Sequence, residues 1–189
     1  MTGRKLPALP AADALVADDI VYFERAGGSR KVTLDTLLDA LDALKSFGSL
    51  FMQDNTTATS IPSDSTFVKV AGTTEAGLTQ RMAATTNRLT RGSGANLRRY
   101  SAQAILTAEG DANTIVEAAL YVGGVDNPGI LAASRFKGTI PSGGRPLTLA
   151  TGALLELPGS AWVEVWIARP ASTGALTVTD LRLDAVEVG

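Results

Sequence analysis

The hydrophobic positions of this chain change their period once, near residue 49. Before that point, leucines recur at the spacing of one face of an α-helix: Leu34, Leu37, Leu38, Leu41 and Leu44. After it, apolar and polar residues alternate with period two, as in strands that bury one face of a sheet. The pattern predicts a short amphipathic helix followed by a mainly β body.

Three runs in the body show the alternation most clearly, at 99–107, 116–122 and 162–167. In the last of them, Val163, Val165 and Ile167 alternate with Trp162, Glu164 and Trp166. Successive side chains of a strand point to opposite faces, so each run is predicted to bury one face and expose the other.

The final segment, 176–188, changes phase twice along its length. The apolar pairs that mark the three phases are Leu176/Val178, Leu181/Leu183 and Val186/Val188. A shift of one residue exchanges the two faces of a strand, so we expect bulges, or a strand that crosses between sheets, at both changes.

Turn residues separate the runs at short intervals, for example at Asn87, Gly92–Gly94, Asn127–Gly129 and Ser142–Gly144. Many short strands with such turns indicate an antiparallel sandwich or barrel. We therefore predict an antiparallel jelly-roll β-sandwich, preceded by a short β-hairpin and an amphipathic α-helix that together form an adaptor.

The N-terminal part divides into an arm and a module. Pro7 and Pro10 favour extended backbone in residues 1–12, which we interpret as a docking arm. Residues 13–48 are expected to form a hairpin–helix module for attachment or oligomerisation, with Thr33 as helix N-cap and Gly48 ending the helix. Residues 49–189 form the head.

The leucine face of the predicted helix has two interpretations. It can pack on its own domain, or it can associate with other copies around an axis, because its spacing also fits a coiled coil. Fewer than two heptads are present, which is too short to distinguish the two. In either case the five leucines are attachment or oligomer-interface candidates.

The composition excludes most catalytic designs. The sequence contains neither histidine nor cysteine, so imidazole bases, thiolate nucleophiles and the usual zinc ligands are absent. A net charge of −2 gives no reason to expect nucleic acid as a partner, and no apolar run is long enough to insert into a membrane. We predict a non-enzymatic protein without cofactor or metal, although a site built only of carboxylates remains open.

Two groups of side chains are candidates for binding. Five arginines and no acidic residue lie between Leu78 and Ala108, so the segment forms either an anion-binding strip or solvent- and subunit-facing strand positions. The two tryptophans share one strand face and can stack on sugar rings, or pack in the core or in a subunit interface. The candidates for the head interface or a ligand site are Trp162, Trp166, Arg98 and Arg99.

A resemblance to a known class of proteins covers most of the chain. Residues 14–23, followed by 27–38 with their Lys31-Val32-Thr33 element, resemble the N-terminal module of bacteriophage tail-fibre-type proteins, where a hairpin leads into a helix. Residues 51–59, 67–74, 85–90 and 162–183 resemble the jelly-roll domains of phage virions. Such domains are comparable in shape to trimers of the tumour-necrosis-factor type.

The resemblance implies a structural protein located in the virion, such as a fibre, spike or decoration protein. It implies a homotrimer whose N-terminus binds another virion protein of the portal, capsid, tail or baseplate. A host-surface glycan is its expected ligand, with neither nucleic acid nor membrane insertion. On the residues alone, a carbohydrate-binding module or a carboxylate glycosidase on the same fold is the alternative.

Overall fold

The computed structural model describes residues 20–25, 28–33, 45–94 and 96–188. The chain divides into two compact units, residues 1–44 and 45–189, and each is described by itself. The predicted arm at 1–12 and the predicted helix at 34–44, with its five leucines, lie outside the described residues.

The described residues of the first unit form a hairpin. Strand β1 (Ile20–Arg25) pairs antiparallel with β2 (Gly28–Thr33), and the register joins Ile20 to Thr33 and Arg25 to Gly28. The hairpin predicted from the sequence is confirmed.

The second unit, the head, contains a six-stranded antiparallel sheet in the order β13-β9-β15-β3-β6, with β4 beside β15. Its strands are β3 (Phe47–Met52), β4 (Ala58–Ile61), β6 (Glu75–Gln80), β9 (Arg98–Glu109), β13 (Leu147–Leu157) and β15 (Gly174–Glu187).

A seven-stranded antiparallel sheet forms the other layer, in the order β11-β10-β14-β8-β7, with β12 beside β10 and β5 beside β14. Its strands are β5 (Val68–Lys69), β7 (Met82–Thr85), β8 (Arg88–Arg91), β10 (Ile115–Gly123), β11 (Gly129–Ile130), β12 (Phe136–Thr139) and β14 (Trp162–Ala168). A 3₁₀ turn, η1 (Ala132–Ser134), precedes β12.

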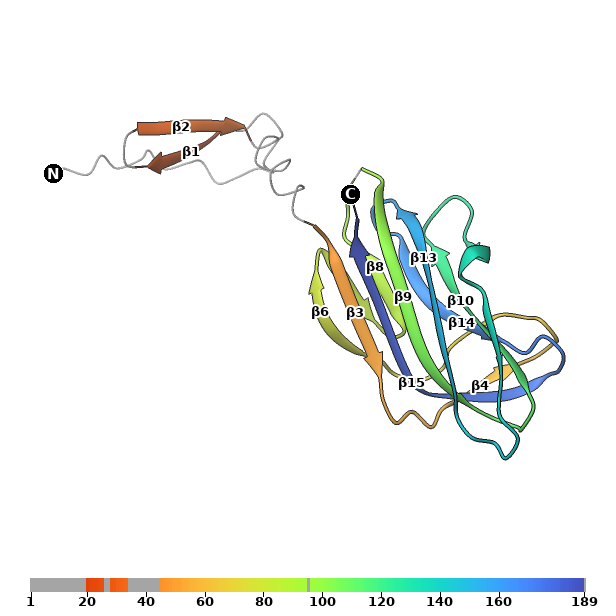
Figure 1. Cartoon of the computed structure of the whole chain (residues 1–189). Helices are drawn as coiled ribbons and strands as arrows, with labels where there is room; N and C mark the ends of the chain where they lie inside the picture. Colours follow the sequence, from red (N-terminus) through yellow and green to blue (C-terminus); the bar gives the residue numbers. More distant parts are fainter. Residues whose placement is uncertain (1–19, 26–27, 34–44, 95, 189) are drawn as a thin grey trace. The chain divides into compact units, whose positions relative to one another are not determined.

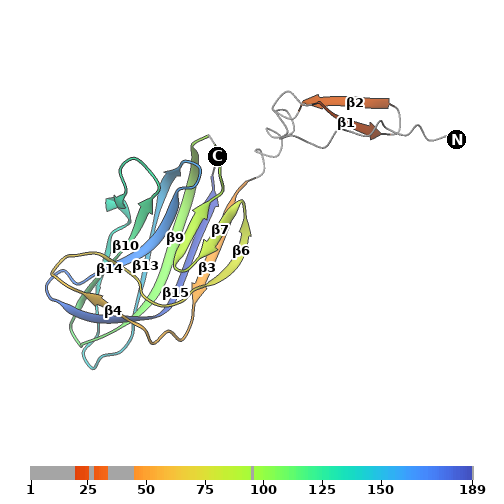
Figure 2. The same ribbon diagram turned by 180° about the vertical axis from the view of Figure 1, so that it is seen from behind.

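The chain moves back and forth between the two layers, as Figures 1 and 2 show from opposite sides. Strands β8, β9 and β10 lie in alternate sheets, and so do β13, β14 and β15. Antiparallel sheets with this alternation form a jelly-roll sandwich. The predicted fold of the head is confirmed.

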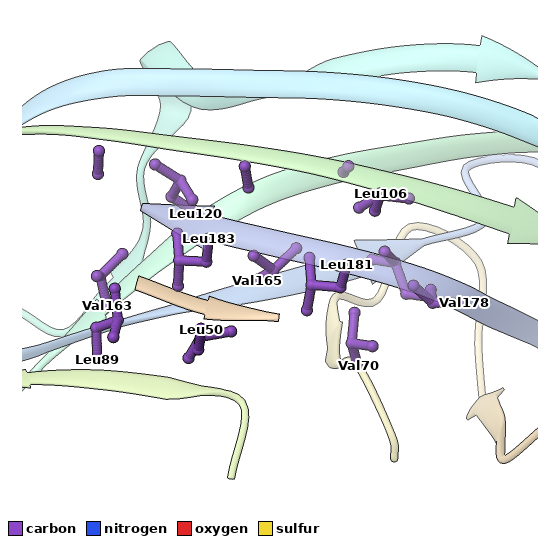
Figure 3. Close-up of a cluster of buried hydrophobic side chains, with 14 of the residues drawn as sticks. Leu50, Val70, Leu89, Leu106, Leu120, Val163, Val165, Val178, Leu181 and Leu183 are labelled. Atoms are coloured by element: carbon purple, nitrogen blue, oxygen red, sulfur yellow. The ribbon is translucent and has the colours of Figure 1, made fainter. Parts of the chain in front are cut away.

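The core lies between the sheets, where side chains of both layers meet (Figure 3). Leu50 and Leu183 of the six-stranded sheet, and Leu120 and Val163 of the seven-stranded sheet, have no exposed surface. Each of the runs at 99–107 and 162–167 buries one face, as predicted, although Glu164 on the other face of the second run is also buried. Such interdigitating rows of aliphatic side chains are the main stabilising feature of the head.

The final strand departs from the sequence prediction at one point. The first phase change is confirmed, because the register of β15 against β9 shifts between Val178 and Asp180. The second phase change is wrong: the pairing continues without a shift, and Ala185 takes the buried position. Val186 therefore lies on the outer face and is 47% exposed.

Gly48 also differs from its prediction, because it lies within β3 rather than at the end of a helix. A Cβ at this position would lie 3.0 Å from the Cβ of Met82, so close strand packing explains the glycine. Phe47 pairs with Val186, which places the start of β3 and the end of β15 at one end of the sandwich. We call this the proximal end, and the opposite end the distal end.

Candidate functional site

The outer face of the six-stranded sheet carries exposed aliphatic side chains. Ile105 of β9 is 53% exposed and Leu154 of β13 is 73% exposed. Ser101 pairs with both Leu154 and Val186, so these two apolar residues flank a small one in a single row across three strands. This face therefore presents apolar surface to solvent.

Small and uncharged residues fill much of the rest of this face, including the exposed Ala150 and Gly152 of β13. Arg182 is bound to its neighbour on the same strand face, Asp184, with 2.7 Å between Nε and Oδ2. A hollow of about 500 Å³ lies between Phe51, Ile105 and Arg182. The face thus combines exposed aliphatic side chains with the ion pairs Arg182–Asp184 and Arg99–Glu156.

The outer face of the seven-stranded sheet is built differently, around the buried carboxylate of Glu164. Lys69 Nζ and Arg88 Nε donate to Glu164 Oε1 at 2.8 and 2.7 Å. Trp166 Nε1 donates to Oε2 at 2.9 Å. The side chain of Glu164 is only 3% exposed, so a charged group in the middle of a sheet face is covered by its own partners.

These donors determine the protonation of Glu164. Burial by itself raises the pKa of this carboxyl, but the hydrogen bonds from Lys69, Trp166 and Arg88 and the charge of Lys69 outweigh burial. The pKa of Glu164 therefore lies below its ordinary value, and the group is ionised at neutral pH.

Glu117 of β10 forms a second centre of the same kind. Arg135 Nε donates to its Oε1 at 2.5 Å, and Lys137 Nζ lies 3.6 Å from Oε2. The guanidinium of Arg135 also lies 5.2 Å from the centroid of the Phe67 ring, which gives it a cation–π contact. The Glu117 side chain is 2% exposed.

Aromatic rings accompany the two centres. Tyr121 stacks on Trp166 with ring centroids 4.3 Å apart and planes at 9°. Tyr121 pairs with Glu164, and Ala119, two residues earlier on β10, pairs with Trp166, so the stacked rings are diagonal neighbours on adjacent strands. Both rings are partly exposed.

Trp162, the other predicted aromatic candidate, is held by its neighbours. The guanidinium of Arg88 lies 4.3 Å from its ring centroid. A Cβ at Gly123 would lie 2.4 Å from the ring, and one at Gly124 would lie 2.7 Å from it. The ring therefore rests closely on the Gly123–Gly124 backbone, which gives Trp162 a packing role.

The structure separates the four predicted site residues in the head. Trp162 and Trp166 lie on the outer face of the seven-stranded sheet, whereas Arg98 and Arg99 lie on β9 of the six-stranded sheet. Arg98 is bound to Glu187 at 2.5 Å, and the exposed Arg99 to Glu156 at 2.9 Å.

The five arginines between residues 78 and 108 do not form one strip. Arg88 belongs to the Glu164 centre, while Arg91 is buried and donates to the backbone carbonyls of Asn96 and Leu157, both at 2.5 Å. Arg91 thus joins the loop before β9 to the end of β13. The arginines thus take part in separate packing contacts and ion pairs. Of the five, only Arg88 lies in the Glu164 centre, next to the aromatic rings.

A polar cluster fixes the proximal end. The backbone N–H of Ser46 donates to Glu187 Oε2 at 2.8 Å, and Ser46 Oγ lies 2.6 Å from the hydroxyl of Tyr100. Burial raises the pKa of Glu187, but the hydrogen bonds from Ser46 and from Arg98 outweigh it and leave the pKa below its ordinary value. The cluster ties the first residues of the head to its last strand.

Sequence reasoning missed two groups of residues. Glu164 was visible only as a charge between two tryptophans, and its cationic partners come from strands 76 and 95 residues away in the sequence. Leu154 and Val186 interrupt the alternation of apolar and polar residues in their strands. A hydrophobic residue at a position that the alternation assigns to the outer face was the sequence signal that could have identified this exposed apolar surface.

Within the described residues, no three histidine, cysteine or acidic side chains come together to bind a metal ion. Nor do these residues include a helix with the length and hydrophobicity required to cross a membrane.

No protein-family profile matches the sequence, and no curated protein sequence is significantly similar to it. Solved structures, in contrast, match the head. Murine APRIL at pH 5.0 aligns with a TM-score of 0.54 and 14% identity, over 77% of this chain and 100% of that chain. The Eiger TNF of S. frugiperda aligns with a TM-score of 0.55 and 11% identity, over 76% and 94%. The head therefore has a tumour-necrosis-factor-like jelly-roll fold.

Proposed function

We propose that this chain is a structural bacteriophage virion protein, a fibre, spike or decoration protein, whose head assembles as a homotrimer. The observation that carries the proposal is the uncovered apolar face of the six-stranded sheet, centred on Ile105, Leu154 and Val186. Large aliphatic side chains that are exposed on a sheet face among polar residues are typical of a protein–protein interface. A second and a third copy are its proposed occupants.

The fold supports three copies rather than two, because tumour-necrosis-factor-like sandwiches are typically trimeric. The virion role is supported by the sequence resemblance of residues 14–38 and by the β1–β2 hairpin that this resemblance implies. In this proposal the module at 13–48 attaches the protein to the particle, and the arm at 1–12 docks on a virion partner.

Binding rather than turnover fits the chemistry of the head. A glycosidase needs a general acid with a raised pKa beside a second carboxylate. The pKa of Glu164 is lowered instead, and each of the buried carboxylates Glu164 and Glu117 is held by two cations. These contacts favour a display protein over a carboxylate glycosidase.

Light scattering behind size exclusion tests the assembly. We expect a mass of three chains, each of 19.5 kDa. Ile105→Glu combined with Leu154→Glu should give a folded monomer, because an interface would have to bury the new charges. Phe136→Glu is the matched control, since Phe136 is 52% exposed on the opposite sheet. A monomeric wild-type protein, or a trimeric double variant, would contradict the proposal.

The virion role requires a separate experiment. Particles purified from the phage that encodes the chain should contain it by mass spectrometry, and should lose it when residues 1–12 are deleted. The truncated protein should keep the melting temperature of the head. Full incorporation of the truncated chain would rule out the docking arm, and absence of the intact chain from particles would rule out the virion role.

A further inference from the structure

On the outer face of the seven-stranded sheet the carboxylates are buried and the cationic side chains are exposed to solvent. The side chains of Glu117 and Glu164 are 2% and 3% exposed. The cations above them are much more accessible: Lys69 32%, Arg88 36%, Arg135 44% and Lys137 57%. Four positive charges stand over two negative ones, so the cluster has an excess of positive charge on its solvent side.

The buried glutamates also orient the arginines. Arg88 and Arg135 each bind their carboxylate through Nε, at 2.7 and 2.5 Å. This bond uses one of the five N–H donors of a guanidinium, so donors remain for a further acceptor. An arginine fixed in this way loses little side-chain entropy on binding, and its planar fork suits carboxylate, sulfate or phosphate oxygens.

The two centres lie too far apart for one small anion. Glu117 pairs with Ala168, which is four residues beyond Glu164 along β14. Four residues of strand span about 13 Å. Ala119, which pairs with Trp166, lies between the centres on this face and is fully buried. A ligand that contacts both centres must therefore be extended.

Apolar contacts are available beside the charges. The stacked rings of Tyr121 and Trp166 are partly exposed, and Phe67 lies under Arg135. Aromatic rings next to cations provide surfaces for the C–H groups of sugars and donors for their acidic substituents. Single-stranded nucleic acid requires rings on which successive bases stack, whereas Tyr121 and Trp166 stack on each other.

We propose that this face binds an acidic glycan, with its anionic groups on Arg88 and Arg135 and its sugar rings against Tyr121 and Trp166. The inference rests on the proposed function in one respect: an interface on the six-stranded sheet leaves this face directed outward. Binding itself can be measured in any assembly state.

Paired substitutions remove each arginine together with its buried partner. Arg88→Gln with Glu164→Gln, and Arg135→Gln with Glu117→Gln, conserve net charge and leave no unpaired buried carboxylate. The matched control is Arg99→Gln with Glu156→Gln, an exposed pair at 2.9 Å on the other sheet. The three variants differ from one another in position and not in charge.

Tryptophan fluorescence provides the readout, because both tryptophans of the chain lie on this face. The full chain is titrated with oligogalacturonate, dextran sulfate, neutral dextran, polyglutamate and single-stranded DNA. The first two probes distinguish carboxylate from sulfate. We expect at least one of them to bind, with the affinity lowered about tenfold or more in each of the two paired variants and unchanged in the control.

Several outcomes would overturn the inference. These are no binding of either acidic glycan, equal binding of neutral dextran or polyglutamate, tighter binding of DNA, or wild-type affinity in both paired variants. If those variants do not fold, Tyr121→Leu and the exposed Lys137→Gln replace them, with weaker glycan binding expected. A trimer that binds no glycan contradicts only this inference, whereas a monomer that binds one contradicts only the proposed assembly.

Discussion

The outer faces of the two sheets both follow from the same alternation of side chains along their strands, yet they differ in how their side chains are shielded from water. On the six-stranded sheet, Leu154 is 73% exposed and is paired across the strands with the small residue Ser101. On the seven-stranded sheet, Glu164 is nearly as buried as the core because Lys69 and Arg88 lie over it. The apolar side chains of the first face are left exposed, whereas the buried carboxylate of the second face is covered by side chains of the same sheet.

The difference shows that a side chain on the outer face of a sheet can be shielded from water in two ways. Apolar side chains are removed from water only by another surface, and burying them provides a driving force of about 25 cal/mol per Å² for association. Ionic groups can be removed from water by long cationic side chains of the same sheet, whose aliphatic stems cover neighbours while their charged ends stay wet. The first arrangement predicts a protein partner and the second a polar ligand.

The largest effect should come from removing the cover of Glu164. Lys69→Met with Arg88→Met leaves a buried carboxylate without its cations, and we expect the free energy of unfolding at pH 7 to fall by about 3–5 kcal/mol. Urea denaturation measures the change. The same double substitution combined with Glu164→Gln should cost far less, because no buried charge remains.

Arg182→Met is the counterpart on the other face. The Arg182 side chain is 69% exposed and bound to Asp184, so its loss should change stability by less than about 1 kcal/mol. If Arg182→Met and the Lys69→Met/Arg88→Met double substitution lowered the free energy of unfolding by similar amounts, the structural difference between the two faces would not be reflected in stability.

A smaller effect is expected where Trp162 rests on the sheet. Gly123→Ala would place a Cβ 2.4 Å from the ring, and displacing the ring should cost about 1–3 kcal/mol in the free energy of unfolding. Gly129→Ala is the matched control, because nothing lies within 4 Å of a Cβ built there. Thermal melting compares the two, and equal melting temperatures would contradict the close packing of Trp162.

A still smaller effect than that of Gly123→Ala concerns Glu187, a carboxylate of the six-stranded sheet that is bound by an arginine and by a further donor, as Glu164 is. Its pKa in the folded state is lowered from 4.5, so its contribution is fully present above the unfolded-state value and is lost as pH falls through the folded-state value. Glu187→Gln should reduce stability by about 1 kcal/mol at pH 7. The difference from wild type should shrink in acid, and a difference constant from pH 7 to pH 3 would contradict the assignment.

Residues whose environment depends on their own strand were predictable from the sequence. Alternation alone placed Val163, Val165 and Ile167 on one strand face and Trp162 and Trp166 on the other, and the structure buries the first of these faces in the core. The jelly-roll sandwich followed from many such runs with turns between them.

Residues whose environment depends on distant strands were not predictable. Arg88 and Lys69 reach Glu164 only because β8 and β5 both pair with β14, and no local spacing encodes that arrangement. Val186 was assigned to the wrong phase because a hydrophobic side chain was assumed to point inward. Its exposure instead marks the surface on which the proposed assembly depends.

The pairing of Phe47 with Val186 has a consequence for how this head can change over generations. Strand β3 starts at the proximal end and β15 ends there (Figure 1). The two are joined by the hydrogen bond between Ser46 and Glu187. The distal loops, such as the fully exposed segment 141–146, take no part in that junction. Insertions accumulate where backbone is exposed and bears no such bonds, so the distal loops are the part of the head most free to diversify.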